Sequence, residues 1–271
     1  MPQRKLEGQV AWISGGASGM GEATAELFAA EGASVAIADV QADLGNALAD
    51  KIMGQGGRAV FHACDVGSED QVRQSIDRTM SQYGGLQIVV NCAGIVHVKL
   101  LHEYSEADWD KLMAVNLKSI FFSMKHAYEH LRRSKRSYMV NIGSISSFIG
   151  QALTPAYSSS KSAMLQLTRS IALDYAAIGL RANCICPGIT DTPMLRFHLS
   201  STPDAESTLQ KRLKRVPMGI RMMPVDIAKA CLYFACEDSS GITGTSLVVD
   251  GGYLAAAEWE TDKTAFMESQ K

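Results

Sequence analysis

The sequence lacks an excess of charge of either sign, because 26 Lys and Arg residues nearly balance 28 Asp and Glu residues among its 271 positions. The formal net charge of -2 at pH 7 provides no general attraction to nucleic acid or to an anionic membrane surface. No stretch approaches the ~18 consecutive apolar residues that a membrane-spanning helix requires. Residues 1–8, MPQRKLEG, contain no apolar core of the kind found in a secretory signal. We therefore expect a cytoplasmic protein with no nucleic-acid or membrane partner.

Cysteine is also scarce, and its six copies are scattered through apolar segments, as expected of small buried side chains in a reducing compartment. Cys184 and Cys186 have no companion Cys or His pair nearby, which favours packing over metal binding. His126 and His130 have the one-turn spacing of some zinc ligands, but no third ligand is evident. The sequence predicts no metal site.

Glycine, by contrast, is concentrated near the start of the chain. Residues 15–21 read GGASGMG and lie between an apolar segment at 9–14 and a helix-forming segment at 22–30. A strand, a glycine turn and a helix in this order present backbone N–H groups and a positive helix end to a pyrophosphate. The spacing Gly-x-x-x-Gly-x-Gly differs from the Gly-x-Gly-x-x-Gly fingerprint of dinucleotide sites. A tight turn with a purely structural role therefore remains an alternative.

An acidic residue ends the second predicted strand. The apolar segment 34–38 is followed by Asp39, about 20 residues past the glycines, where a carboxylate accepts hydrogen bonds from the hydroxyls of an adenosine ribose. A carboxylate there repels a 2′-phosphate, and neither Val40 nor Gln41 supplies a compensating cation. We therefore predict NAD(H) rather than NADP(H). The alternative role of Asp39 is to cap the helix that begins near residue 42.

Further apolar segments alternate with helix-forming segments along the rest of the chain. The predicted strands span 58–64, 86–91, 138–142, 179–186 and 245–250. This alternation predicts an α/β fold, a doubly wound parallel sheet of the Rossmann type, in a single domain over residues 1–271. Ligands of such sheets bind beyond the carboxyl ends of the strands. Polar residues stand at these ends, namely Asp39, Asp65, Asn91 and Ser144.

The central chemical motif combines Ser144 with Tyr157 and Lys161. Tyr157 and Lys161 are four positions apart, just after Pro155, so one helical face carries both. A nearby ammonium favours the phenolate and lowers a pKa that is normally about 10, which makes a tyrosine usable as an acid or base. Ser144 follows the predicted strand 138–142, where its hydroxyl can hydrogen-bond a reacting oxygen. Considered alone, the pair is more typical of a surface tyrosine beside a solvated lysine.

Together, the glycine turn and the Ser144, Tyr157 and Lys161 set resemble the short-chain dehydrogenase/reductase family, and the resemblance covers nearly the whole chain. It implies hydride transfer between a nicotinamide cofactor and an alcohol or carbonyl group, with Tyr157 as the acid–base group and Ser144 holding the reacting oxygen. It implies further that Lys161 lowers the pKa of Tyr157 and reaches the nicotinamide ribose. Asn116 would hold a water that links Lys161 to solvent. A hydrogen bond from Asn116 to a neighbouring backbone carbonyl is the alternative.

The same resemblance identifies the residues expected to bind the cofactor. These are Gly15, Ser18, Gly19, Met20, Gly21, Asp39, Val40, Asp65, Val66, Asn91, Ala93, Gly94, Tyr157, Lys161, Pro187, Gly188, Ile189 and Thr192. Asp65 is expected at the adenine, and Ile189 and Thr192 at the nicotinamide carboxamide. The chain departs from the family pattern at Cys92, usually Asn, and at Ser14, usually Thr, and both changes are small. Family members are commonly tetramers, so the resemblance implies a homotetramer.

The segment 189–223 is irregular and rich in methionine, and a predicted helix spans 205–215 within it. Long excursions in a compact domain are usually functional, so we interpret this segment as a lid over the substrate. Its cationic residues are Arg196, His198, Lys211, Arg212, Lys214, Arg215 and Arg221. They either favour an anionic or hydroxylated substrate or form a solvated face. Other residues expected to reach the pocket are His97, Lys99 and Gln151, and the charged tail 254–271 is expected to cross a subunit interface or to be disordered.

The sequence therefore predicts an enzyme, an NAD-dependent dehydrogenase that acts on a secondary alcohol or its ketone. A sugar, polyol or sugar acid is the preferred substrate class, followed closely by alicyclic alcohols. An NADPH-dependent carbonyl or 3-ketoacyl reductase is the first alternative. Asp39 argues against it, as does Ser18, which stands where NADP-dependent members of the family often carry a basic residue. A catalytically silent nucleotide-binding scaffold is the second alternative, and it would be expected to lack a catalytic residue.

Overall fold

The computed structural model describes residues 4–256 and contains a seven-stranded parallel sheet in the order β3-β2-β1-β4-β5-β6-β7. Its strands are β1 (Val10–Ser14), β2 (Ser34–Asp39), β3 (Arg58–Ala63), β4 (Ile88–Asn91), β5 (Ser137–Ile142), β6 (Leu180–Pro187) and β7 (Ser246–Val249). All the predicted strands are confirmed, and their ends differ from the predicted ones by at most two positions. Every residue of β1, β2, β4, β5 and β6 is buried, as is typical of parallel strands covered on both faces.

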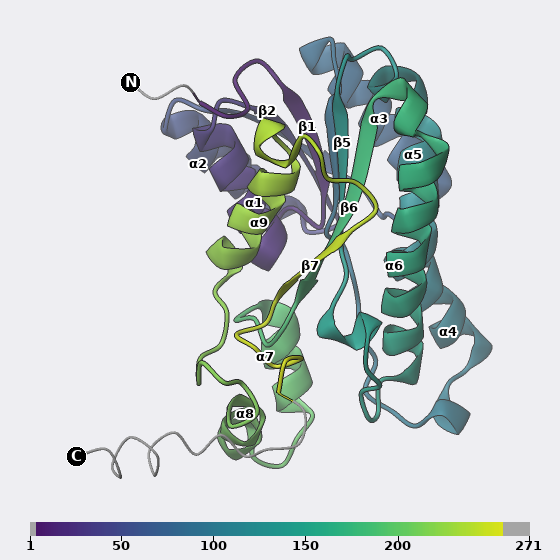
Figure 1. Ribbon diagram of the computed structural model, residues 1–271, viewed down its shortest axis with the longest axis vertical. Helices are drawn as coiled ribbons and strands as arrows, with labels where there is room; N and C mark the ends of the chain where they lie inside the picture. Colours follow the sequence, from purple (N-terminus) through teal and green to yellow (C-terminus); the bar gives the residue numbers. More distant parts are fainter. Residues whose placement is uncertain (1–3, 257–271) are drawn as a thin grey trace.

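Helices cover both faces of the sheet (Figure 1). One layer consists of α1 (Gly19–Ala30), α2 (Ala42–Gly54) and α9 (Pro224–Phe234), and the other of α3 (Glu69–Tyr83), α5 (Ser119–Leu131) and α6 (Pro155–Asp174). Successive residues of a strand point to opposite faces, so Ala11 and Ile13 pack against the first layer whereas Trp12 packs against the second. The fold is therefore the predicted doubly wound α/β sheet in a single domain.

The sheet reverses its winding direction at β1. This strand lies between β2 and β4, so the chain runs outward to β3 on one side before it returns to β4 on the other. Ligands of doubly wound sheets bind beyond the carboxyl ends of the strands at such a reversal. The polar residues predicted at strand ends therefore gather at one edge of the molecule.

A long helical stretch between β4 and β5 is divided into three parts. It consists of α4 (Glu106–Met113), the π-helical turn η2 (Ala114–Lys118) and α5, and Ser105 caps its start by accepting a hydrogen bond from Asp108 N at 3.1 Å. Such wide turns are rare and occur frequently at functional sites. The remaining short elements are the 3₁₀ turns η1 (Leu101–Glu103), η3 (Ile145–Ser147), η4 (Ala176–Ile178) and η5 (Glu237–Ser239).

The proposed lid segment is more regular than its sequence indicates. It contains α7 (Pro193–Ser200), which the sequence did not predict, and α8 (Ala205–Leu213), which ends two residues before the predicted helix. Thr192 begins α7 by accepting a hydrogen bond from Leu195 N at 3.3 Å, and Pro193 occupies the first helical turn. Figure 1 shows α7 and α8 beside one another at one end of the sheet.

No helix within residues 4–256 is both long enough and apolar enough to cross a membrane. The prediction for the tail 254–271 falls almost entirely outside the described residues, which end at residue 256.

Candidate active site

The glycine turn brings the backbone of two segments unusually close together. Gly15 has φ +64°, and a Cβ there would lie 2.6 Å from Ala93 Cα in the loop that follows β4. A Cβ on Gly21, in the first turn of α1, would lie 2.0 Å from the Gly15 carbonyl oxygen. Only glycine permits these approaches, and they place the N-terminus of α1 at the carboxyl edge of the sheet. Backbone N–H groups at this helix end suit the pyrophosphate of a dinucleotide.

Asp39, at the end of β2, is 6% exposed and holds the glycine turn in place. Its carboxylate accepts hydrogen bonds from Ala17 N and from Gln41 N, each at 3.0 Å. The alternative role as a helix cap is not observed, because α2 follows Gln41 without a side-chain cap. The carboxylate therefore lies beside the glycine turn, at the position from which it is expected to bind a ribose.

The ends of β1, β4 and β5 are joined by side-chain hydrogen bonds. Ser14 Oγ accepts hydrogen bonds from Cys92 N at 3.2 Å and from Ala93 N at 3.4 Å. Asn91 donates to Asn141 Oδ1 at 2.8 Å. Asp65, two residues past the end of the edge strand β3, accepts from Gly67 N at 2.8 Å. These bonds fix the loops on which the predicted residues Val66, Ala93 and Gly94 lie.

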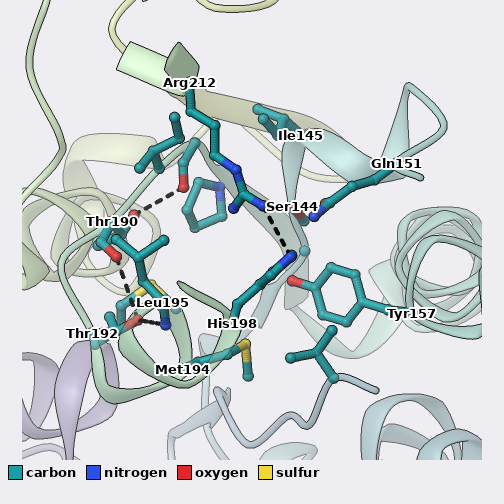
Figure 2. A pocket seen from close by; sticks show the side chains of 16 residues that line it. Ser144, Ile145, Gln151, Tyr157, Thr190, Thr192, Met194, Leu195, His198 and Arg212 are labelled. Atoms are coloured by element: carbon teal, nitrogen blue, oxygen red, sulfur yellow. Dashed lines mark hydrogen bonds between the residues drawn. The ribbon is translucent and has the colours of Figure 1, made fainter. Parts of the chain in front are cut away.

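Ser144 and Tyr157 line one cavity, of about 130 Å³, with the residues that follow β6 (Figure 2). Ser144 Oγ accepts a hydrogen bond from Ser146 N at 3.0 Å, which orients the serine at the start of η3. Lys161 Nζ lies 5.7 Å from the centre of the Tyr157 ring and donates to the carbonyl of Ile142 at 2.6 Å. The three predicted catalytic groups thus come together at the carboxyl edge of the sheet.

The pKa of Tyr157 is shifted in the direction opposite to the one predicted from the sequence. Burial raises the pKa of Tyr157 above its ordinary value because it disfavours the phenolate, and the Ser144 side chain opposes this by hydrogen bonding. Burial also lowers the pKa of Lys161, whose residue is 3% exposed. The predicted lowering of the Tyr157 pKa by Lys161 is not found in this geometry, in which the ammonium group lies against the ring and the Ile142 carbonyl.

Asn116, in the π-helical turn, is fully buried and makes three hydrogen bonds. Its Oδ1 accepts from Ile95 N at 2.8 Å, and its Nδ2 donates to Ile95 O at 2.9 Å and to Ser160 Oγ at 3.1 Å. The alternative predicted for Asn116, a bond to backbone, is therefore part of its role. These bonds connect the loop after β4 to the helix that carries Tyr157 and Lys161.

The predicted nicotinamide side of the site also lines the cavity. Pro187, Gly188, Ile189 and Thr192 border it together with Met20 from the start of α1. Thr192 Oγ1 is within 3.4 Å of the Thr190 carbonyl, to which it donates. The residues expected at the nicotinamide therefore lie in the same cavity as Tyr157.

The lid and the loop after β5 supply further side chains to the cavity. Ser146 Oγ donates to Gln151 Oε1 at 2.9 Å, which orients Gln151, one of the three residues expected to reach the pocket. Lys99 is instead paired with Asp108 at 2.6 Å. His198 and Arg212 enter the cavity from the lid, and Arg212 contacts His198 at 3.0 Å. Both residues were identified in the sequence as part of a basic segment, but the contact between them depends on the packing of α7, which was not predicted, against α8.

No group of three or more His, Cys, Asp or Glu side chains within residues 4–256 is arranged to hold a metal ion. His126 Nε2 lies 3.1 Å from Glu69 Oε1, so its contact in the structure is with a carboxylate of α3.

Known proteins resemble this chain over almost its full length. The profile of a protein family described as enoyl-(acyl carrier protein) reductase matches residues 15–254. An uncharacterized oxidoreductase of Thermotoga maritima is 38% identical over 250 residues, with 92% of this chain and 99% of that protein covered. Cis-4-hydroxycyclohexanecarboxylate dehydrogenase of Sinomonas cyclohexanicum is 37% identical, with 91% and 97% covered. The structure of the aldohexose dehydrogenase of Thermoplasma acidophilum is 34% identical and superimposes with a TM-score of 0.85, with 94% and 98% covered.

Proposed function

The chain belongs to the short-chain dehydrogenase/reductase family of oxidoreductases, and on that premise we propose that it transfers hydride between NAD(H) and a secondary alcohol or its ketone. The observation that carries the proposal is the convergence of Ser144, Tyr157 and Lys161 at the carboxyl edge of the sheet, beside a cavity. The carboxylate of Asp39, bonded to the glycine turn at the same edge of the sheet, supports NAD(H) as the cofactor.

In this proposal Tyr157 is the acid–base group. Its phenolate oxygen removes the hydroxyl proton of the alcohol during oxidation, and the phenol returns a proton to the ketone oxygen during reduction. Bound NAD(H) supplies the hydride acceptor or donor. Ser144 Oγ accepts from Ser146 N, and its own proton, which is directed to the Tyr157 oxygen in this structure, would hold the reacting oxygen once substrate is bound. General acid–base catalysis of this kind typically increases a reaction rate by about 10²- to 10⁴-fold.

Lys161 and Asn116 support Tyr157. An ammonium group has three N–H bonds, and Lys161 uses one on the Ile142 carbonyl, so the other two remain for a ribose hydroxyl and for the proton path. Asn116 acts as a positioning residue through Ile95 and Ser160. Its Oδ1 has a second lone pair, which suits the water proposed to connect Lys161 to solvent.

Asp39 should determine which dinucleotide binds. We expect Asp39→Asn to remove the charge that repels a 2′-phosphate. Ala17 N and Gln41 N bind different carboxylate oxygens, so the single amide oxygen of asparagine keeps one of these two bonds. The ratio of NADPH to NADH dissociation constants should then fall by about tenfold or more, which corresponds to ~1.4 kcal/mol. Titration of both nucleotides by fluorescence measures this ratio. Asp43→Asn, an exposed acid in the first turn of α2, is the matched control.

An unchanged ratio in Asp39→Asn would remove Asp39 from cofactor selection. Tighter binding of NADPH than of NADH by the unmodified protein would favour the NADPH-dependent reductase instead.

The substrate proposal is a small alicyclic secondary alcohol, or a sugar, polyol or sugar acid, or the corresponding ketone. The size of the cavity, about 130 Å³, supports a small molecule. Two relatives are named for substrates of these classes, one for cis-4-hydroxycyclohexanecarboxylate and the other for aldohexoses. Ile145, Met194 and Leu195 supply apolar contacts, and Ser144, Gln151 and Tyr157 supply polar ones.

The two directions of the reaction should depend on pH differently. Burial raises the pKa of Tyr157, so the phenolate needed for oxidation is a minor form at neutral pH and increases about tenfold per pH unit. The oxidation rate should therefore still rise between about pH 6 and 9, whereas reduction, which needs the phenol, should stay nearly constant. Initial rates in both directions test this. An oxidation rate that levels off near neutral pH would show that the phenol ionises more readily than its burial implies.

We also propose that the protein forms a homotetramer and is located in the cytoplasm. A homotetramer is supported by large apolar side chains left exposed on the outer helices, with Phe121 of α5 at 50% and Leu173 of α6 at 81% exposure. A cytoplasmic location is supported by the six cysteines, all of which are free thiols in the structure.

A further inference from the structure

The cavity beside Tyr157 contains a cation that the proposed mechanism does not use. Arg212 lies on α8, and its half-buried side chain enters the cavity lined by Ser144 and Tyr157. Figure 2 shows the guanidinium of Arg212 and the imidazole of His198 converging on the part of the cavity that the Tyr157 hydroxyl faces. Arg212 is the one permanently charged side chain among the described residues that line this cavity.

Other cations of the lid are engaged elsewhere. Arg196 and Arg221 both pair with Asp191, at 2.7 and 3.4 Å. The guanidinium of Arg215 lies over the ring of Tyr253, 5.0 Å from its centre. The basic character of the lid is therefore mostly neutralised or directed away from the cavity, and Arg212 is the exception.

Arg212 has no acidic partner in the part of the chain that the structure describes. Its Nη2 lies 3.0 Å from Nε2 of His198, an arrangement in which the guanidinium donates and the imidazole accepts. Burial and the adjacent Arg212 both lower the pKa of His198, so this imidazole is neutral and orients Arg212 without compensating its charge. A half-buried cation without a counter-ion is costly, and an anionic ligand would offset that cost.

We propose that Arg212 binds a carboxylate of the substrate, which makes the substrate a hydroxy acid, or the corresponding keto acid. This proposal rests on the proposed function, because the secondary hydroxyl of the same molecule must reach Tyr157. A planar guanidinium matches a carboxylate through two parallel hydrogen bonds. One cation in a small cavity suits a monoanion of this kind better than a phosphate, which carries more charge.

Binding of a non-reacting acid tests the site without turnover. The probe is cyclohexanecarboxylate, titrated into the enzyme–NADH complex, and cyclohexanecarboxamide is its neutral counterpart. We expect the acid to bind more tightly than the amide, and Arg212→Gln to weaken binding of the acid by about 10- to 100-fold while it leaves the amide nearly unchanged. Arg212→Lys should weaken binding of the acid less than Arg212→Gln does, because lysine retains the positive charge.

Lys211→Gln is the matched control, because Lys211 is an exposed cation next to Arg212 on α8. It should bind the acid like the unmodified protein, and an unchanged NADH dissociation constant shows that each variant is folded. Equal binding of acid and amide, or equal loss of both in Arg212→Gln, would overturn the proposal.

Measurements of turnover distinguish failure of the carboxylate-binding proposal from failure of the proposed dehydrogenase function. Oxidation of cis-4-hydroxycyclohexanecarboxylate is compared with oxidation of its methyl ester, and the Arg212→Gln change should lower kcat/KM for the acid alone. If the ester is oxidised as well as the acid, the dehydrogenase function stands and the carboxylate site does not. If neither compound nor any other secondary alcohol is oxidised although NAD⁺ binds, the proposed function itself fails.

Discussion

Tyr157→Phe is expected to lower kcat for alcohol oxidation by at least about 10³-fold, because the change removes the only atom that exchanges a proton with the substrate in the proposed mechanism. The ring remains, so its packing and the contact with Lys161, 5.7 Å from the ring centre, should persist. The dissociation constant of NADH should change by no more than about twofold. Steady-state rates and a fluorescence titration with NADH measure the two quantities.

Tyr175→Phe provides the matched control for this variant. Tyr175 stands at the other end of the same helix, where its ring packs on Tyr128 with 5.6 Å between ring centres. The change removes the same single oxygen atom far from the cavity and should leave kcat unaltered. Substantial turnover by Tyr157→Phe would show that another group transfers the proton. Ser144 would then be the next residue to test, because it lines the same cavity.

Gly21→Ala is expected to abolish measurable cofactor binding, with an NADH dissociation constant at least about 10²-fold larger. The added Cβ would lie 2.0 Å from the Gly15 carbonyl oxygen and 2.9 Å from Gly16 Cα. Both are backbone atoms, so no side-chain rotation relieves the overlap, and the turn must move away from the N-terminus of α1. Loss of that arrangement removes the N–H groups proposed to bind the pyrophosphate. Titration with NADH, together with thermal unfolding, measures the effect.

Gly54→Ala separates this effect from a general intolerance of alanine. Gly54 is the last residue of α2 and has no positive φ, and a Cβ there would meet no atom within 4 Å beyond its chain neighbours and its own helix. Alanine at this position should leave NADH binding unchanged and slightly raise the melting temperature, since alanine is favoured over glycine in helices. If Gly21→Ala bound NADH as well as Gly54→Ala does, the glycine turn would have no part in cofactor binding.

Much of this molecule follows from local patterns in the sequence. The apolar strands end at polar residues, and because all strands are parallel, those residues must meet at one edge. Ser144 and Tyr157 could be placed in one site for that reason, and Tyr157 and Lys161 share a helical face by spacing alone. Asp39 was also correctly placed at the end of β2.

Other features depend on contacts that no local pattern encodes. The π-helical turn around Asn116 arises where its amide bonds to Ile95, a residue 21 positions away. The pKa of Tyr157 is raised because burial, which is a tertiary property, outweighs the Ser144 hydrogen bond. The direction of Arg212 could not be predicted, because it depends on the packing of α8 against α7 and on contact with His198.

The most direct test of the proposed function is the initial rate of NADH formation with NAD⁺ and a panel of sugars, sugar acids, polyols and alicyclic alcohols, with NADP⁺ in parallel. We predict that NAD⁺ is reduced with at least one secondary alcohol of the panel, that NADP⁺ is reduced far more slowly, and that Tyr157→Phe is inactive. Binding of NAD⁺ without oxidation of any alcohol of the panel at any pH would contradict the proposed function for these substrate classes and favour a nucleotide-binding scaffold. Faster reduction of NADP⁺ would contradict the role proposed for Asp39.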